Sequence, residues 1–101
     1  MKDKIKALIV EPNKEPYTIE HKYIEDKLYG LIYYPFEKLE IEKDIFLIFS
    51  KQAKSNEKMF PKNRQIEGHQ IYGTFAVVKM QNNQYVSLTE KEIVELKQYF
   101  K

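Results

Sequence analysis

The sequence predicts an α+β fold, in which about five strands form a small antiparallel or mixed sheet and two helices accompany it. Two observations lead to this prediction. Short apolar runs rich in β-branched residues recur along the 101 residues, each bounded by turn residues. An amphipathic helix with its own N-terminal cap closes the chain, and we expect it to pack on the sheet. No linker interrupts the sequence, so we expect residues 1–101 to form a single domain.

The first third of the chain predicts two strands and a helix. The run "IKALIVE" (Ile5–Glu11) is apolar and β-branched, which favours a buried strand, and the later "YTIE" favours a short edge strand. A helix is expected at residues 21–29, because Ile24 and Leu28 lie on one helical side. Gly30 follows as a usual C-terminal stop.

The middle of the chain predicts two more strands and a loop. The runs "LIYYPF" (Leu31–Phe36) and "DIFLIFS" (Asp44–Ser50) are apolar, and the charged stretch "EKLEIEK" connects them. Pro35 lacks a backbone donor, so the first of these strands should end there or lie at a sheet edge. The second suits a central strand that is covered on both faces. Residues 51–71 are expected to form a long loop.

The C-terminal third predicts a hairpin followed by a helix. The strands "YGTFAVVKM" and "QYVSL" are separated by Gln81, Asn82 and Asn83, and asparagine tolerates the left-handed conformation that a tight hairpin turn requires. Thr89 and Glu92 have the spacing of a capping box, in which each residue caps the backbone of the other. The apolar stripe of the helix that follows falls at Ile93, Leu96 and Phe100.

Composition argues against most catalytic chemistry. The chain has no cysteine, and its two histidines, His21 and His69, are far apart in sequence, so we predict neither a metal site nor a cofactor. We find no nucleophile–base arrangement and no glycine-rich phosphate loop, and we therefore predict no catalytic residue. A cofactor-free acid/base enzyme built on Glu11, Asp44 or a histidine is the enzymatic alternative. No apolar run is long enough to span a membrane, and we expect a cytoplasmic protein.

Positive charge is concentrated in one segment. The net charge is +2, but residues 51–64 alone carry +4, from four lysines and Arg64 against the single acid Glu57. Arg64 is the only arginine in the chain, which indicates a position that needs guanidinium geometry rather than charge alone. The segment is either a solvated loop whose lysines aid solubility or a docking surface for phosphate or an acidic partner.

Four stretches, in the same order, resemble a known family. They are "KALIVEPNKEPY", "YYPF", "PKNRQI" before "YGTFAVVK", and "YVSLTEKEIVELKQYF". The chain resembles a family of small domains of unknown function carried by bacteriophages and plasmids of Gram-positive bacteria. The resemblance implies a mobile-element accessory protein in a bacterial cytoplasm, with no established reaction. The positions that match the family pattern are Glu11, Pro12, Tyr17, Pro35, Pro61, Asn63, Arg64, Gly73, Thr74, Phe75, Ser87 and Thr89.

Three of these matches, Glu11, Asn63 and Arg64, are polar residues beside turns, and together with Lys58 and Lys62 they are the candidate site residues. In one interpretation Arg64 pairs with Glu11 inside the fold and acts as a structural clamp. In the other, Arg64 and Asn63 face outward with Lys58 and Lys62 and hold an anionic ligand or partner. Arg64→Ala should lower the melting temperature in the first case and abolish binding in the second.

These observations favour a non-catalytic binding module. We expect it to act on a host defence or regulatory component, either by docking on a host or phage protein or by capturing a small anionic, nucleotide-like ligand. A homodimer could complete a ligand site, since so small a domain has little room for a deep pocket. Nucleic-acid binding through the basic segment is the alternative. Tyr33, Tyr34, Tyr72 and Tyr99 are candidates for a docking patch, although we expect most tyrosines to pack in or near the core.

Overall fold

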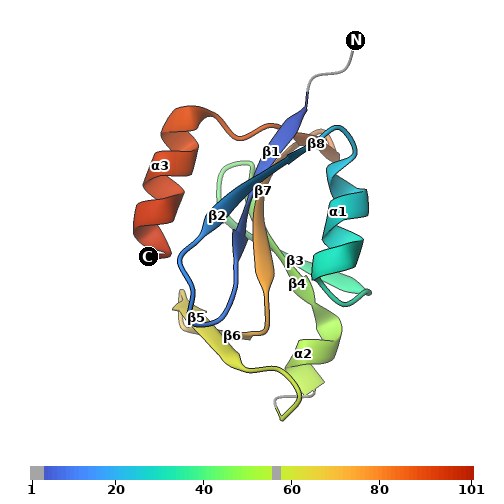
Figure 1. Cartoon of the computed structure of the whole chain (residues 1–101), viewed down its shortest axis with the longest axis vertical. Coiled ribbons are helices and arrows are strands. Elements are labelled where there is room, and N and C mark those ends of the chain that lie inside the picture. Colours follow the sequence, from blue (N-terminus) through green and yellow to red (C-terminus); the bar gives the residue numbers. More distant parts are fainter. Residues whose placement is uncertain (1–3, 56–57) are drawn as a thin grey trace.

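The computed structural model in Figure 1 describes residues 4–55 and 58–101. It confirms the α+β fold, with a C-terminal helix packed on an antiparallel sheet. Asn56 and Glu57 of the basic segment lie outside the described residues. In chain order the elements are β1 (Ile5–Val10), β2 (Tyr17–His21), α1 (Ile24–Leu31), β3 (Phe36–Glu42), β4 (Ile45–Ser50), α2 (Lys51–Ser55), β5 (Lys62–Ile66), β6 (His69–Tyr72), β7 (Phe75–Gln81), β8 (Gln84–Val86) and α3 (Glu90–Tyr99).

The main sheet has the strand order β2-β1-β7-β4-β3, and each pair of neighbours is antiparallel. The short β8 pairs with the last residues of β7, Lys79–Gln81. β7 is therefore the central strand. β4, which the sequence predicts to be central, lies next to it and is interior and largely buried. β2 and β3 form the two edges.

Alternate residues of the inner strands point to opposite faces, and a helix covers each face (Figure 1). On one face, Leu8, Leu47 and Val77 pack with residues of α3. On the other, Ile9, Ile48 and other buried side chains pack with residues of α1. The sheet thus separates two apolar clusters, one on each face.

The segment around residues 31–42 departs from the prediction. The prediction of a strand at Leu31–Phe36 is wrong. Helix α1 continues through Gly30 to Leu31, and the Ile32 amide donates a hydrogen bond to the Leu28 carbonyl oxygen. Ile32 is buried one turn beyond Leu28, so packing extends the helix past its expected glycine stop. The charged stretch expected to be a connection is the edge strand β3, in which half-buried and exposed residues alternate over most of its length.

The prediction of a long loop at residues 51–71 is also wrong for the residues of this segment that the structure describes. It contains the short helix α2 and the hairpin β5–β6, which forms a second, two-stranded sheet at one end of the molecule (Figure 1). The hairpin turns at Glu67 and Gly68, which both have positive φ, 49° and 81°. Two consecutive positive φ values are the geometry of a tight hairpin turn. Within the described residues the fold therefore has eight strands and three helices rather than five and two.

The C-terminal elements confirm the prediction closely. Asn82 and Asn83 have positive φ values of 53° and 61° in the β7–β8 turn. The capping box is complete, because the Glu92 amide donates to Thr89 Oγ1 at 3.1 Å and the Thr89 amide donates to Glu92 Oε1 at 2.8 Å. The predicted apolar stripe at Ile93, Leu96 and Phe100 is buried. No helix in the described part of the chain is long and apolar enough to cross a membrane.

Candidate functional site

The side chain of Arg64, on β5, binds the backbone of two other parts of the fold. Its Nη1 donates to the Glu11 carbonyl oxygen at 2.8 Å and its Nη2 to the Lys14 carbonyl oxygen at 2.5 Å, both in the turn after β1. Its Nε donates to the carbonyl oxygen of Phe100, the C-cap residue of α3, at 3.0 Å. One planar guanidinium therefore joins the hairpin, the β1–β2 turn and the end of α3.

Asn63 continues this network on the neighbouring position. Its Nδ2 donates to the carbonyl oxygens of Val10 at 2.9 Å and Gly73 at 2.7 Å, and its Oδ1 accepts from Arg64 Nη1 at 3.0 Å. Gln70, on the paired strand β6, donates to the Asn63 carbonyl oxygen at 3.2 Å. We call Asn63 and Arg64 together the Asn63–Arg64 clamp. Their side-chain donors bond groups within the fold, and both side chains are half-buried.

Glu11 contacts Arg64 in a different way from that expected. The guanidinium bonds the Glu11 carbonyl oxygen rather than its carboxylate, which corrects the expected ion pair. The carboxylate instead accepts from the Tyr17 hydroxyl at 2.6 Å and lies 3.4 Å from Lys14 Nζ. The hydrogen bond from Tyr17 lowers the pKa of Glu11, whereas burial and this carboxylate raise the pKa of Tyr17 to about 12. The turn after β1 presents its carbonyl oxygens to the clamp.

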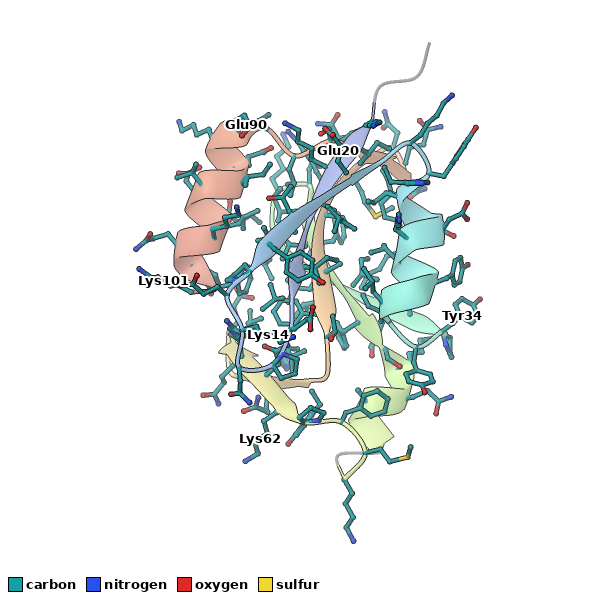
Figure 2. All side chains as sticks on the ribbon, viewed as in Figure 1. Lys14, Glu20, Tyr34, Lys62, Glu90 and Lys101 are labelled. Carbon is teal, nitrogen blue, oxygen red and sulfur yellow. The ribbon has the colours of Figure 1, made fainter. Side chains whose placement is uncertain are left out.

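Lys58 and Lys62 are exposed, and Figure 2 shows Lys62 pointing into solvent from the hairpin end of the molecule. The structure thus brings Asn63, Arg64 and the Glu11 backbone together and leaves the two lysines at the surface. Ligand or partner binding by these five residues stays a prediction.

An exposed aromatic surface lies close to the hairpin, and the sequence singled out two of its residues, Tyr33 and Tyr34, but not Tyr29, Met59 or Phe60. The side chains of Tyr33, Tyr34 and Met59 are 69%, 63% and 73% exposed, which is unusual for large apolar groups. Tyr33 packs edge-on against Phe60, with 5.6 Å between ring centroids, and Tyr34 lies 5.4 Å from the ring of Tyr29. We call Tyr29, Tyr33, Tyr34, Met59 and Phe60 the aromatic surface. Figure 2 shows Tyr34 pointing outward beyond the end of α1.

The exposure of Tyr33 and Tyr34 agrees with their choice as patch candidates, but five of the eight tyrosines are exposed, which corrects the expectation that most of them pack in or near the core. Tyr99 and Tyr23 are also more than half exposed. Core positions on the described strands are filled mainly by aliphatic side chains, which leaves the tyrosines of α1 and the following turn outside. The sequence signal was present, since "YYPF" follows the helix at a proline-containing turn, and turns lie at the surface.

A hollow of about 240 Å³ opens within the aromatic surface, with Leu31, Tyr33, Met59 and Phe60 among its walls. Its position depends on Gly73, which has a φ of 75° and contacts the Phe60 ring so closely that an added Cβ would lie 2.9 Å from Phe60 Cδ1. The Gly73 amide also bonds the Pro61 carbonyl oxygen at 2.7 Å, and Asn63 holds the Gly73 carbonyl oxygen. The clamp and the aromatic surface are therefore connected through Gly73.

Two larger hollows lie on the face of the sheet that α3 covers. One, of about 400 Å³, has Leu39, Phe49 and Ile71 in its walls, and the other, of about 330 Å³, includes Glu92 and Glu95. Within the described residues, no three histidine, aspartate or glutamate side chains gather as a metal site would require. Neither hollow contains the candidate residues of the basic segment, whereas a shallow hollow of about 420 Å³ has Lys58, Lys62 and Tyr72 among its walls.

The fold and these surfaces define a small α+β protein with a clamped hairpin beside an exposed aromatic surface. The chain belongs to the family described as "Domain of unknown function (DUF3846)", whose model matches residues 5–101. No curated protein and no solved structure matches the chain. Membership of a family of domains of unknown function is thus confirmed, whereas its distribution among phages and plasmids stays a prediction.

Proposed function

We propose that this protein is a non-catalytic binding module, which docks on an acidic partner protein through its aromatic surface. The observation that carries the proposal is the exposure of Tyr33, Tyr34 and Met59, each more than 60% exposed, of which Tyr33 and Met59 line one hollow. Tyrosine and methionine are enriched at protein interfaces, where they supply contact area together with a polar or adaptable group. A solvated surface with no partner gains nothing from such a cluster.

The charge around this surface supports an acidic partner. The exposed Lys58 and Lys62 flank Met59, Phe60 and Pro61 in the sequence, and the surrounding segment 51–64 carries +4. Lysines at the rim of an interface attract an acidic partner and raise its association rate, while the apolar centre supplies most of the affinity. We therefore expect the partner to bring acidic side chains around an apolar anchor.

The hollow supports the same arrangement. Its walls include Leu31, Tyr33, Met59 and Phe60, and it is open to solvent at the exposed tyrosine. A hollow of about 240 Å³ suits one large apolar side chain of the partner rather than a nucleotide. Interfaces often centre on a single residue of this kind, surrounded by contacts that exclude water.

The clamp geometry weighs against capture of a small anionic ligand by Arg64. Four of its five N–H groups donate to oxygen atoms within the fold, so an anion held by two N–H groups would have to displace at least one bond to Asn63 or to the carbonyl oxygens of Glu11, Lys14 or Phe100. Those carbonyl oxygens would then lose their partner, which costs free energy wherever they are shielded from water. The clamp supports a structural role, and Lys58 and Lys62 support the binding role. The context that the resemblance implies makes a host defence or regulatory protein in the bacterial cytoplasm the proposed partner.

A peptide selection tests the proposal. A random peptide library is selected against the whole protein, and selected peptides are measured by calorimetry with wild type, the Tyr33→Ser/Met59→Ser double variant and a Val94→Ser control. Val94 is 66% exposed on α3, so the control removes an exposed apolar side chain elsewhere. We expect acidic peptides with a central apolar residue, and at least about tenfold weaker binding by the double variant alone, since buried interface anchors are worth about 2 kcal/mol or more. Selected peptides that bind all three proteins equally would contradict the proposal.

Nucleic-acid binding is the second candidate, and the exposed tyrosines give it a specific observation. Tyr33 and Tyr34 are exposed, and Tyr33 packs on Phe60, which lies between Lys58 and Lys62 in the sequence, so the tyrosines would stack bases of a single strand while the lysines contact phosphates. Such binding would weaken steeply with salt. Titration of a fluorescent mixed-sequence single strand at two salt concentrations distinguishes the candidates. Tight, salt-dependent binding that Tyr33→Ser abolishes would favour nucleic acid over a protein partner.

A further inference from the structure

The edge strand β3 offers a second interaction surface, which adjoins the aromatic surface at Phe36, whose ring lies 5.2 Å from Tyr29 and 5.5 Å from Tyr34. β3 (Phe36–Glu42) pairs with β4 on one side, and the sheet order places no described strand on its other side. An edge strand presents backbone donors and acceptors that another strand can pair with. At seven residues, β3 is the longer of the two edge strands, since β2 has five.

The pleat restricts how two copies of β3 could pair. In an antiparallel strand pair, directly opposite side chains lie on the same face of the sheet. A twofold axis between two copies of one strand must therefore pass beside a residue that lies opposite its own copy. Leu39 is the midpoint of Phe36–Glu42, so centring the axis there pairs the whole strand. In that register Lys38 of each copy lies opposite Glu40 of the other.

The charges of β3 favour this register over its neighbours. Centring the pair on Lys38 would place two lysines opposite each other, and centring it on Glu37 or Glu40 would oppose two glutamates. Centring on Ile41 would oppose Glu40 and Glu42. Opposite charges facing one another across a strand pair are stabilising, whereas like charges are destabilising. The register centred on Leu39 gives two Lys38–Glu40 pairs and no direct like-charge pair.

We propose that two copies of this chain associate through antiparallel pairing of their β3 strands, centred on Leu39, with Lys38 of each copy opposite Glu40 of the other. The two six-stranded sheets would then form one continuous sheet. Lys38 and Glu40 are both exposed, and Leu39 is half-buried against the α3 cluster, so that pairing covers its remaining apolar surface. The Glu40 carboxylate also accepts from the Asp44 amide at 3.1 Å, which restrains it near the strand.

The other edge lacks this complementarity. In β2 (Tyr17–His21), the residue at the midpoint is Ile19, so self-pairing places Thr18 opposite Glu20 and Tyr17 opposite His21. Neither is an acid–lysine pair. The irregularity in the β3–β4 pairing falls between Glu40 and Glu42, which leaves the central residues of β3 in regular register. Of the two edge strands, only β3 therefore has a midpoint register that places lysines opposite glutamates.

Sedimentation equilibrium of the whole protein tests this proposal through charge reversal. Wild type should show a concentration-dependent mass that rises toward twice 12.2 kDa. Lys38→Glu and Glu40→Lys should each weaken association by about tenfold or more, because each creates two like-charge pairs per dimer. An equimolar mixture of the two variants should regain association, since position 38 of one then faces an opposite charge at position 40 of the other. Lys91→Glu, at an exposed position on α3, is the matched control and should associate like wild type.

Three outcomes would overturn the proposal. Wild type could stay monomeric to millimolar concentration. The single variants could associate as strongly as wild type, which would place any dimer elsewhere on the surface. The mixture of the two variants could fail to regain association, which would exclude the register centred on Leu39. Circular dichroism of each variant identifies any loss of association that comes from unfolding. The double variant Lys38→Glu/Glu40→Lys carries both reversals in one chain, so two copies of it restore both opposite-charge pairs and should associate again.

Discussion

Arg64 Nε donates to the carbonyl oxygen of Phe100, 3.0 Å away, and so places a guanidinium at the C-terminal end of helix α3. The last carbonyl groups of a helix lack partners within the helix and carry partial negative charge, so a cation there is stabilising. The same guanidinium bonds the carbonyl oxygens of Glu11 and Lys14. A lysine could not reach three acceptors in one plane, which explains why the single arginine of the chain stands at this position.

Replacing Arg64 by lysine should destabilise the fold although the charge is kept. We expect Arg64→Lys to lower the free energy of unfolding by about 1–3 kcal/mol, because several charge-assisted hydrogen bonds are lost. For a chain of this size that corresponds to a fall in melting temperature of at least about 4 °C. Urea and thermal unfolding followed by circular dichroism measure both quantities. Lys62→Ala, exposed two positions earlier, is the control and should change stability by less than about 0.5 kcal/mol. Equal stability of Arg64→Lys and wild type would refute the clamp.

Substitution by alanine should have opposite effects on stability at Gly73 and at Gly30. Gly73→Ala forces a residue with a Cβ into a φ of 75° and against the Phe60 ring, so we expect a loss of about 1–3 kcal/mol. Gly30 lies within α1, and a Cβ there would meet no atom within 4 Å. Gly30→Ala should therefore stabilise the protein by about 0.5–1 kcal/mol. Chemical denaturation of both variants gives the comparison, and a stabilising Gly73→Ala would show that Phe60 does not pack as described.

The capping box of α3 should contribute to acid sensitivity. Burial raises the pKa of Glu92, but hydrogen bonds from the Thr89 backbone and Lys79 outweigh it and leave the pKa below its ordinary value of 4.5. A carboxylate with a lowered folded-state pKa contributes stability that is present above pH 4.5 and is lost as the pH falls further. The stability difference between wild type and Glu92→Gln should therefore shrink below that pH. Urea midpoints at neutral and acidic pH measure it, with Glu95→Gln on the same helix as control. A constant difference would contradict the assigned contacts.

At alkaline pH two tyrosines should titrate late. Burial is the main cause that raises the pKa of both Tyr17 and Tyr85 to about 12, and the carboxylates of Glu11 and Glu25 add to it. Because the folded state favours the neutral phenol, their contribution is complete below pH 10 and is lost as the pH rises toward 12. Absorbance titration of tyrosinate should show a late step that is smaller in Tyr17→Phe and in Tyr85→Phe. In denaturant this step should move to about pH 10. Persistence of the full step in the double variant would contradict the assignment.

The sequence predicted those elements whose signals are local. The apolar runs of β1, β4 and β7 indicated buried strands, and Thr89 and Glu92 marked the start of α3 because a capping box is complete within four residues. The asparagines of the β7–β8 turn have a conformational preference of their own. The α+β class follows from these pieces alone.

The elements that the sequence missed depend on distant contacts. In β3, charged residues alternate with Leu39 and Ile41, a pattern that an edge strand and a solvated connection share, so the sequence alone does not distinguish the two. The hairpin β5–β6 is fixed by Arg64, whose acceptors on Glu11 and Phe100 lie 53 and 36 residues away in sequence. No local pattern reveals such partners, so the sequence left two interpretations of Arg64 open.

The central claim is that Arg64 serves the fold whereas Tyr33 and Met59 serve binding. The most direct test measures melting temperature and affinity for a selected acidic peptide, side by side, for Arg64→Lys and for Tyr33→Ser/Met59→Ser, at a temperature where both are folded. We predict that Arg64→Lys melts lower but binds like wild type, and that the double variant melts like wild type but binds at least about tenfold more weakly. The reverse result, with unchanged melting and lost binding in Arg64→Lys, would contradict the account.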